Sequence, residues 1–209
     1  SPGGGPQTVS QSNYHAIIPI NPAADAPPLQ RVIPLAVGKT LSVEILGRDR
    51  RPLAGARVED REAQDGWGRP LKTSEFRVTG LNPLRPRSLV IEHQPEKLAA
   101  VLVARGDEGG PVRVRLQAWG SATGRLLVDG KPKPGAYVRA VGTSDDEPFA
   151  IHVGADLTTD SEGRFLADRL IAGLRYEFEV LENAIPYGKA PMGKTAKGPV
   201  IHAGERADL

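Results

Sequence analysis

An internal repeat constrains the fold of this chain more than any other feature of its sequence. The phrase Asp49–Val58, DRRPLAGARV, returns 80 residues later as Asp129–Val138, DGKPKPGAYV. Each copy follows a run in which apolar and polar residues alternate, so each predicts a strand, a turn and a second strand. Two such units in 209 residues predict two tandem β-domains. The repeated positions are turn and core residues, so the repeat informs the fold and carries no chemistry.

The strand pattern is clearest where apolar residues recur with a period of two. Leu41, Val43 and Ile45 alternate with Ser42 and Glu44, which predicts a half-buried strand. Further strands of this kind are expected around residues 76–78, 89–91, 112–116, 137–140 and 176–180. The stretch 95–103 leaves two interpretations open: a strand, or a single helical turn that leads into a strand. The sequence therefore predicts an all-β chain whose 24 glycines and 19 prolines supply its turns.

The domain limits follow from shifts in composition. We expect a flexible extension over residues 1–30, one domain over 31–118 and a second over 119–209. The extension is rich in Gly, Pro and Ser, and Ser1–Pro6 looks like the cut edge of a longer protein whose upstream signal or anchor is missing. No long linker separates the two domains, so they should meet at a tight junction with Trp119 buried in it.

Composition and charge disfavour several classes of function. The 27 basic residues barely exceed the 25 acidic ones and are not clustered, and aromatic residues make up 5% of the chain, which disfavours a nucleic-acid partner. The absence of cysteine excludes disulfides, thiolate metal sites and cysteine nucleophiles. No apolar run approaches the ~20 residues that span a bilayer, so we expect no direct membrane span in this fragment.

Residues 120–182 carry a series of phrases that together identify a family resemblance. The phrases are Gly124-Arg125-Leu126, Asp129-Gly130-Lys131-Pro132, Pro134-Gly135-Ala136, Val138, Thr159-Asp160, Glu162-Gly163-Arg164-Phe165, Leu170, Ala172-Gly173 and Tyr176. This series resembles the carboxypeptidase regulatory-like domain, a transthyretin-like β-sandwich. The first unit resembles it as a divergent copy that lacks the Asp-x-x-Gly-x-Phe turn. The positions that it keeps are Pro52, Ala54-Gly55-Ala56 and Val58, with Phe76 and Leu81 in the places of Phe165 and Leu170.

The resemblance implies a fold and a role. It implies two tandem antiparallel Greek-key β-sandwiches of transthyretin or prealbumin type, each seven-stranded and without catalytic residues. Such domains recur as spacer or docking modules, so we expect a non-catalytic structural or interaction module of a larger bacterial extracytoplasmic protein. Its place would be the periplasm or the cell surface, tethered through the missing upstream segment. Its partners would be other domains of the parent protein or a cell-envelope protein.

The search for chemistry favours no enzyme, and we expect no catalytic, cofactor-binding or metal-binding set. The four histidines lack the spacing of a metal pair, and no serine lies in a Gly-x-Ser-x-Gly elbow. An active site would have to form at the domain interface, around His93 or His152. Asp145, Asp146 and Glu147 are candidates for a calcium site, with a solvated acidic loop as the alternative.

Three aromatic residues are candidates for contact with a ligand or a partner. Trp67 and Tyr187 lie in glycine-containing loops, and Tyr137 is expected to face outward from its strand. The competing interpretation of Trp67 is a ring that folds back over its own sheet edge. Exposed rings of this kind stack on sugars, so the alternative function is a carbohydrate-binding module for cell-surface polysaccharide.

Overall fold

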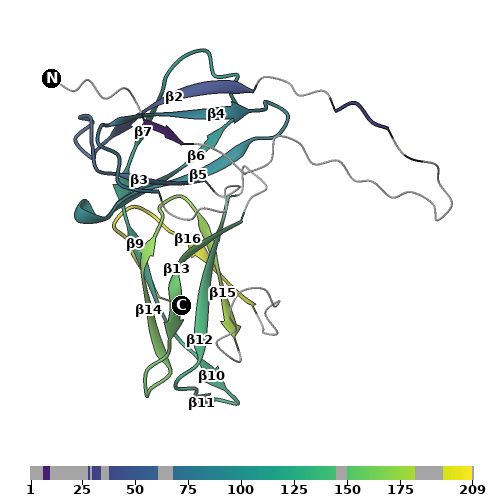
Figure 1. The fold of residues 1–209 in the computed structure, drawn as a ribbon. Helices are drawn as coiled ribbons and strands as arrows, with labels where there is room; N and C mark the ends of the chain where they lie inside the picture. Colours follow the sequence, from purple (N-terminus) through teal and green to yellow (C-terminus); the bar gives the residue numbers. More distant parts are fainter. Residues whose placement is uncertain are drawn as a thin grey trace.

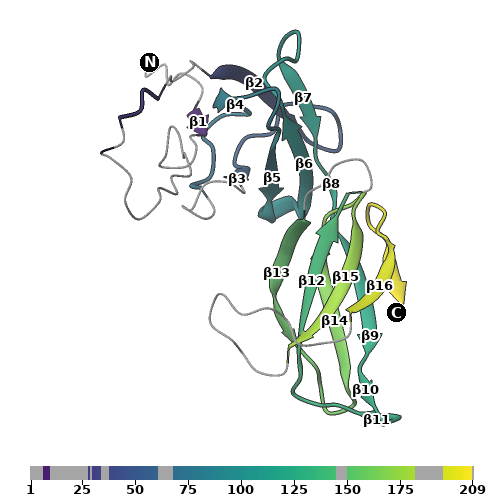
Figure 2. The ribbon, with the colours of Figure 1, turned by 90° about the vertical axis from the view of Figure 1, so that its right-hand side faces the viewer.

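The structure, a computed structural model, describes residues 7–9, 28, 30–33, 38–60, 68–144, 150–181 and 195–208. Within these ranges the chain consists of strands, turns and one short 3-10 turn, and its sheets divide into two groups that share no strand. Figure 1 and Figure 2 show the two groups end to end, the first above the second. The predicted all-β class with tandem β-sandwiches is confirmed.

The first unit is built from two four-stranded sheets. One has the order β1-β4-β2-β7 and the other β3-β5-β6-β8. Its elements are β1 (Gln7–Val9), β2 (Lys39–Leu46), β3 (Arg57–Asp60), β4 (Glu75–Leu81), β5 (Arg87–His93), the 3-10 turn η1 (Gln94–Glu96), β6 (Leu98–Ala104), β7 (Val112–Arg115) and β8 (Gln117–Ala118).

The second unit combines a four-stranded sheet, a three-stranded sheet and a small hairpin. Their orders are β13-β12-β15-β16, β14-β9-β17 and β10-β11. The elements are β9 (Gly120–Arg125), β10 (Leu127–Val128), β11 (Lys131–Pro132), β12 (Tyr137–Thr143), β13 (Ala150–Thr158), β14 (Arg164–Leu170), β15 (Arg175–Leu181), β16 (Thr195–Val200) and β17 (Arg206–Asp208).

The two units repeat one strand order. The sheet β4-β2-β7 corresponds to β14-β9-β17, and the run β3-β5-β6 corresponds to β12-β15-β16. In each unit the strand that precedes the repeated phrase pairs in parallel with the last strand of its sheet, β2 with β7 and β9 with β17. The neighbouring pairs β2 with β4 and β9 with β14 are antiparallel. The repeat in the sequence is therefore a repeat of topology.

The repeated phrase keeps its backbone geometry as well as its residues. Gly55 and Gly135, which are 80 positions apart, both adopt a left-handed conformation, with φ of 87° and 68°. Glycine is favoured there because a Cβ atom disfavours positive φ. One residue later, Ala56 and Ala136 turn into their cores and open strands β3 and β12.

Each unit has a core between its two sheets. The first core takes Leu41, Val43 and Ile45 from β2 and Leu89 and Ile91 from β5, as the period of two predicts. In the second core the inward residues of the four-stranded sheet face those of the three-stranded sheet. They include Ala122, Val138, Ala140, Ala167, Leu170, Tyr176, Phe178 and Ala207. Two facing sheets around one apolar layer are the defining feature of a β-sandwich.

Three segments differ from or refine the sequence expectations. Residues 7–9, inside the expected flexible extension, form a strand that pairs in parallel with the edge of β4, where backbone groups are open to pairing. The stretch 95–103 resolves into the combination of a 3-10 turn that leads into strand β6. The stretch 199–209 predicts a final pair of short edge strands around a Gly-Glu turn. Strands β16 and β17 do flank a turn at Gly204, but they belong to different sheets, and β16 begins earlier, at Thr195.

Candidate functional site

The two units meet with a single residue between their strands. β8 ends at Ala118 and β9 begins at Gly120, which leaves only Trp119 between them. The backbone N–H of Trp119 donates to the carbonyl of Lys97 in the first unit, at 3.0 Å. The guanidinium of Arg169 in the second unit lies over its indole, 5.2 Å from the ring centroid, within the range of a cation–π contact. Trp119 is half-buried and is tied to both units.

An apolar patch of the first unit is buried against the second. Val90 and Ala99 are buried, yet they pack into the hydrophobic cluster of the second unit and not into the first unit's own core. Val101 packs against the same cluster and pairs with Val90 across β5 and β6. We call Val90, Ala99, Val101, Trp119 and Arg169 the junction. Burial of these apolar side chains opposes hinge motion between the two units, because separating the units would expose the side chains to water.

The start of β9 is packed tightly from the other side. A Cβ atom at Gly120 would lie 2.1 Å from Cγ2 of Ile201 and 3.0 Å from the carbonyl oxygen of His202. Only glycine fits without displacement of the buried Ile201 side chain, since real Cβ contacts are longer than 2.1 Å. The N–H of the next residue, Ser121, donates to the carbonyl of Glu205 at 2.8 Å. The close packing at Gly120 and this hydrogen bond therefore restrict the backbone conformation at the start of β9.

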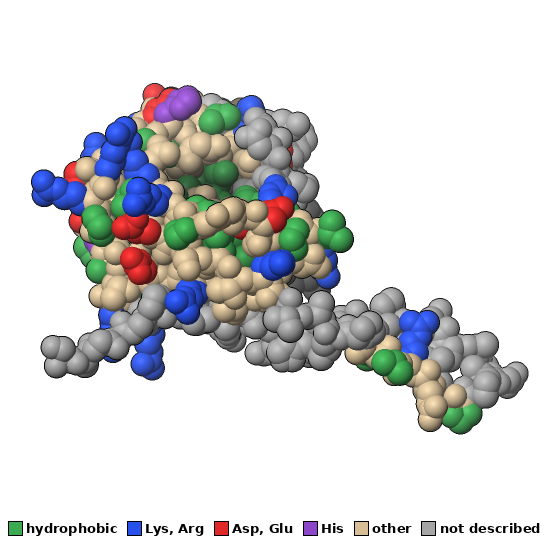
Figure 3. Space-filling view, turned by 90° about the horizontal axis from the view of Figure 1, so that it is seen from above, with side chains coloured by type: hydrophobic (Ala, Val, Ile, Leu, Met, Phe, Trp, Pro, Cys, Tyr) green, Lys and Arg blue, Asp and Glu red, His purple; other side chains and the backbone are tan. Residues whose placement is uncertain are grey.

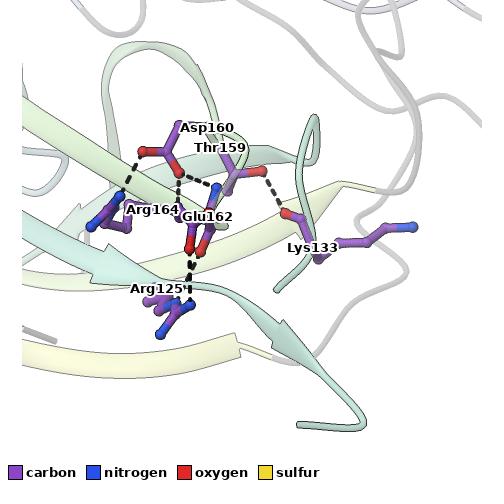
Figure 4. A network of polar contacts seen from close by, with 6 residues as sticks. All are labelled: Arg125, Lys133, Thr159, Asp160, Glu162 and Arg164. Atoms are coloured by element: carbon purple, nitrogen blue, oxygen red, sulfur yellow. Dashed lines mark hydrogen bonds and ion pairs between the residues drawn. The ribbon is translucent and has the colours of Figure 1, made fainter. Parts of the chain in front are cut away.

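The opposite end of the second unit carries an ordered polar turn, drawn in Figure 4. Asp160 Oδ1 accepts from the backbone N–H groups of Glu162 and Arg164, at 2.9 and 2.8 Å, and its Oδ2 lies 3.3 Å from Nε of Arg164. The backbone N–H of Arg164 is the main cause that lowers the pKa of Asp160. Thr159 donates through Oγ1 to the carbonyl of Lys133 at 2.7 Å. The sequence predicts a hairpin turn over Thr159–Phe165. The turn itself is present, with the N–H of Gly163 donating to the carbonyl of Asp160 at 3.0 Å, but the strands β13 and β14 that it connects belong to different sheets and form no hairpin.

A groove with a volume of about 660 Å³ lies beside this turn. Its lining residues come from β9, β14, β17, the end of β13 and the turn that follows β13: Thr123, Gly124, Arg125, Thr158, Asp160, Arg164, Phe165, Leu166, Arg206 and Asp208. We call it the β14 groove. Arg125 pairs with Glu162, with Nε donating to its carbonyl at 2.9 Å, and Arg164 pairs with Asp160. The groove therefore presents charges of both signs rather than a cluster of one sign.

Charge is mixed elsewhere on the surface too. Figure 3, which looks down on the first unit, shows basic and acidic side chains interspersed on that face. This agrees with the near balance of 27 basic and 25 acidic residues in the sequence. A single-sign field that would steer a polyanion does not arise on this described face.

A buried ion pair in the first unit escaped the sequence analysis. Arg87 and Asp60 are only 5% and 4% exposed, and Nη2 of Arg87 is paired with Oδ2 of Asp60. Nη1 of Arg87 donates to the carbonyl of Thr79 at 2.6 Å, while its Nε has no partner among the described residues. Burial lowers the pKa of Arg87. Strand parity could have located the pair, since Asp60 shares a face with Val58 and Arg87 shares one with Leu89.

The second unit has a buried polar group of another kind. Tyr176 lies in the core, and its hydroxyl accepts from the N–H of Ile171 at 2.6 Å and donates to the carbonyl of Ile171 at 3.2 Å. Burial raises the pKa of this hydroxyl well above its ordinary value, although the Ile171 hydrogen bond opposes the shift. The side chain closes the loop between β14 and β15 over the core.

Most of the site residues expected from the sequence lie outside the described residues. Trp67, Tyr187 and the acidic cluster Asp145, Asp146 and Glu147 fall in this class. Tyr137 is described: it opens β12, half-buried, while its neighbour Val138 points into the core. The contact role of these residues stays a prediction.

The remaining chemical candidates are located as follows. His93 is buried at the end of β5, and its Nδ1 accepts from the N–H of Glu96 at 3.3 Å as the cap of η1. Within the part of the chain that the structure describes, no three His, Asp or Glu side chains gather as metal ligands would. No helix long and apolar enough to cross a bilayer occurs in those same ranges.

Comparison with known proteins gives distant structural likeness alone. No protein-family model matches the chain, and no curated protein matches it in sequence. The Bacillus anthracis TIE protein is similar at 14% identity and a TM-score of 0.30, over 83% of this chain and 33% of that chain. A streptococcal ancillary pilin is similar at 13% identity and a TM-score of 0.34, over 82% of this chain and 62% of that chain. The minor pilin of Streptococcus agalactiae is similar at 12% identity and a TM-score of 0.34, over 81% of this chain and 93% of that chain.

The coverage limits what these comparisons mean. The chain spans a third of the length of the TIE protein and less than two thirds of the ancillary pilin. At TM-scores of 0.30 and 0.34 the likeness is loose and assigns neither a fold type nor a function. The chain is therefore distantly similar to pilins and to the TIE protein, without a family assignment.

Proposed function

We propose that this chain is a non-catalytic structural module, a rigid spacer of two β-sandwiches that holds its outer loops at a fixed separation. The observation that carries the proposal is the junction. One residue separates the units, and Val90 and Ala99 of the first unit are buried in the cluster of the second. Domains joined by a flexible linker move independently by default, whereas an apolar interface without slack fixes their relation.

The finer type of each unit belongs to the same proposal. Both units are transthyretin-like sandwiches of the carboxypeptidase regulatory-like kind, which the phrases of the second unit resemble. The shared strand orders support this, as do the left-handed Gly55 and Gly135 at matching positions of the repeated phrase. By that resemblance the module serves in a larger bacterial extracytoplasmic protein, where its partners are neighbouring domains or an envelope protein.

A distance measurement across the junction tests the spacer. The chain has no cysteine, so Ser42→Cys on β2 and Ser161→Cys in the β13–β14 turn give two unique spin-label sites, both exposed. We expect a single narrow distance distribution by pulsed electron paramagnetic resonance. A broad distribution in the otherwise unchanged chain would overturn the proposal, because a spacer must hold its ends apart.

A matched pair of variants tests whether the junction is what fixes the distance between the two units. Val90→Asp places a charge in the interface while it leaves the first core, to which Val90 does not belong, unaltered. It should broaden the distance distribution. Thr40→Asp adds the same charge at an exposed position of β2 and should leave the distribution unchanged. Equal behaviour of the two variants would remove the junction from the account.

A further inference from the structure

The parallel pairs β2 with β7 and β9 with β17 have a mechanical consequence in both units. β2 and β7 run in parallel through four residue pairs, from Val43 with Val112 to Leu46 with Arg115. β9 and β17 run in parallel through three, from Ser121 with Arg206 to Thr123 with Asp208. In each unit the chain therefore enters at one end of the paired strands and leaves at the opposite end.

Tension along the chain loads such a pair in shear. A pull on the N-terminal end of the first strand and the C-terminal end of a parallel partner slides the two strands past each other. All hydrogen bonds between them then bear the force together, because none can break before its neighbours are strained. Two forces applied at the same end of the pair would instead peel the strands apart one residue at a time.

Side chains reinforce both strand pairs. Nε of Arg113 on β7 donates to the Glu44 carboxylate on β2 at 2.8 Å. The hydroxyl of Thr123 on β9 donates to the Asp208 carboxylate on β17. The inward faces are dry, with Val43 and Ile45 buried in the first unit and Ala122 in the second. Water, which competes for strained backbone groups, has no access from that side.

The junction connects the two strand pairs in series. β7 ends at Arg115, the two-residue β8 follows, and β9 begins after Trp119. The strand that ends the first pair thus leads almost directly into the strand that begins the second. Tension that leaves the first unit enters the second without passing through a long loop.

From this geometry we infer that each unit is a shear clamp, and that the chain is a tension-bearing connector. The inference rests on the proposed spacer function and adds to it the direction in which the spacer resists force. The resistance resides in the backbone ladders of β2 with β7 and β9 with β17. It is specific to tension applied through the chain ends of each unit.

Single-molecule pulling with two handle geometries on the second unit tests the inference. One geometry pulls between Gln117→Cys, ahead of β9, and a handle fused after Leu209, which shears β9 against β17. The other pulls between Lys131→Cys, in the hairpin that follows β9, and the same C-terminal handle, which peels β17 from β9. Gln117 and Lys131 are exposed and the chain has no other cysteine, so the folded protein differs only in its point of attachment.

We expect the unfolding force in the shear geometry to exceed that in the peel geometry by at least about twofold, because three residue pairs load together instead of one at a time. Equal forces, or a higher force for the peel geometry, would overturn the shear clamp. The spacer proposal would survive that result if the distance distribution between Ser42→Cys and Ser161→Cys is narrow. A broad distance distribution together with a higher unfolding force in the shear geometry would contradict the spacer proposal and support the shear clamp.

Discussion

The two units place different polar side chains at equivalent buried positions, Arg87 in the first unit and Tyr176 in the second. Strand registers align Val58 with Ile91 in the first unit and Val138 with Val180 in the second. Counting back along each strand from these pairs places Arg87 and Tyr176 at equivalent positions. Both side chains reach the opposite sheet and donate to a backbone carbonyl there: Arg87 to Thr79, inside β4, and Tyr176 to Ile171, directly after β14.

The two side chains differ in the partners that they need when they are buried. Arg87 needs a buried counter-charge, Asp60, and its Nε still lacks a partner among the described residues. Tyr176 needs none, because its hydroxyl accepts from the backbone N–H of one residue, Ile171, and donates to the carbonyl of that same residue. The position aligned with Asp60 in the second unit is Ala140, which is buried and apolar. The first unit is therefore the more vulnerable to a single substitution.

Removal of Asp60 should have the largest effect. Asp60→Ala leaves the Arg87 guanidinium buried without its counter-charge, and we expect a loss of about 3–5 kcal/mol of unfolding free energy. Hydrogen exchange resolved by strand should place the loss in the first unit. The double variant Asp60→Ala, Arg87→Tyr copies the chemistry of the second unit and should recover most of the loss. Failure to recover would mean that the two positions are not equivalent.

Removal of the Tyr176 hydroxyl should cost less. Tyr176→Phe keeps the ring in the core but leaves the N–H and carbonyl of Ile171 without their partner, for a loss of about 1–3 kcal/mol. Urea denaturation measures the loss, and hydrogen exchange assigns it to the second unit. A variant as stable as the parent chain would show that the hydroxyl makes no net contribution.

Alkaline pH should distinguish the two units. The folded-state pKa of Tyr176 is raised by burial, so the folded form holds its proton after the unfolded form has lost it near pH 10. Stability then falls as the pH rises above about 10, by about 1.4 kcal/mol per pH unit for this one group. The lowered pKa of Arg87 acts with the opposite sign. Denaturation of the parent chain and of Tyr176→Phe between pH 9 and pH 11 should show the alkaline loss only in the parent.

The smallest effect concerns the glycines of the repeated phrase. Gly55→Ala and Gly135→Ala both place a Cβ atom at positive φ, at a cost of about 1–2 kcal/mol each. Gly55→Ala should cost more, because its Cβ would lie 3.3 Å from Nε2 of His93, whereas the space at Gly135 is open. Thermal denaturation of the two variants measures the difference. A larger loss for Gly135→Ala would contradict the assigned packing.

Local patterns were sufficient to predict the strands and their buried faces, because these depend on residues that are neighbours in the chain. Alternation identified the inward faces of β2 and β15, and the repeated glycine identified the turn before β3 and β12. Pairing between distant strands left no such trace. The parallel contact of β17 with β9 joins residues more than 80 positions apart, and the parallel strand β1 lies inside a segment whose composition favoured an extension.

The candidate sites were harder to predict for the same reason. Trp119 was identified because it stands alone between two strand patterns. Val90 looked like one apolar residue among several in β5, and only the contact between units shows that it belongs to the junction. The β14 groove combines residues of four strands and a turn from separate parts of the chain, so no single sequence motif predicts it.

Rotational diffusion measured by NMR relaxation tests the central claim of a rigid two-sandwich body most directly. Backbone ¹⁵N relaxation rates for β2–β7 and for β9–β17 should fit one common, anisotropic diffusion tensor. Separate tensors with shorter correlation times for each unit would show that the sandwiches tumble independently, which would contradict the junction, the spacer and the fixed geometry of the whole.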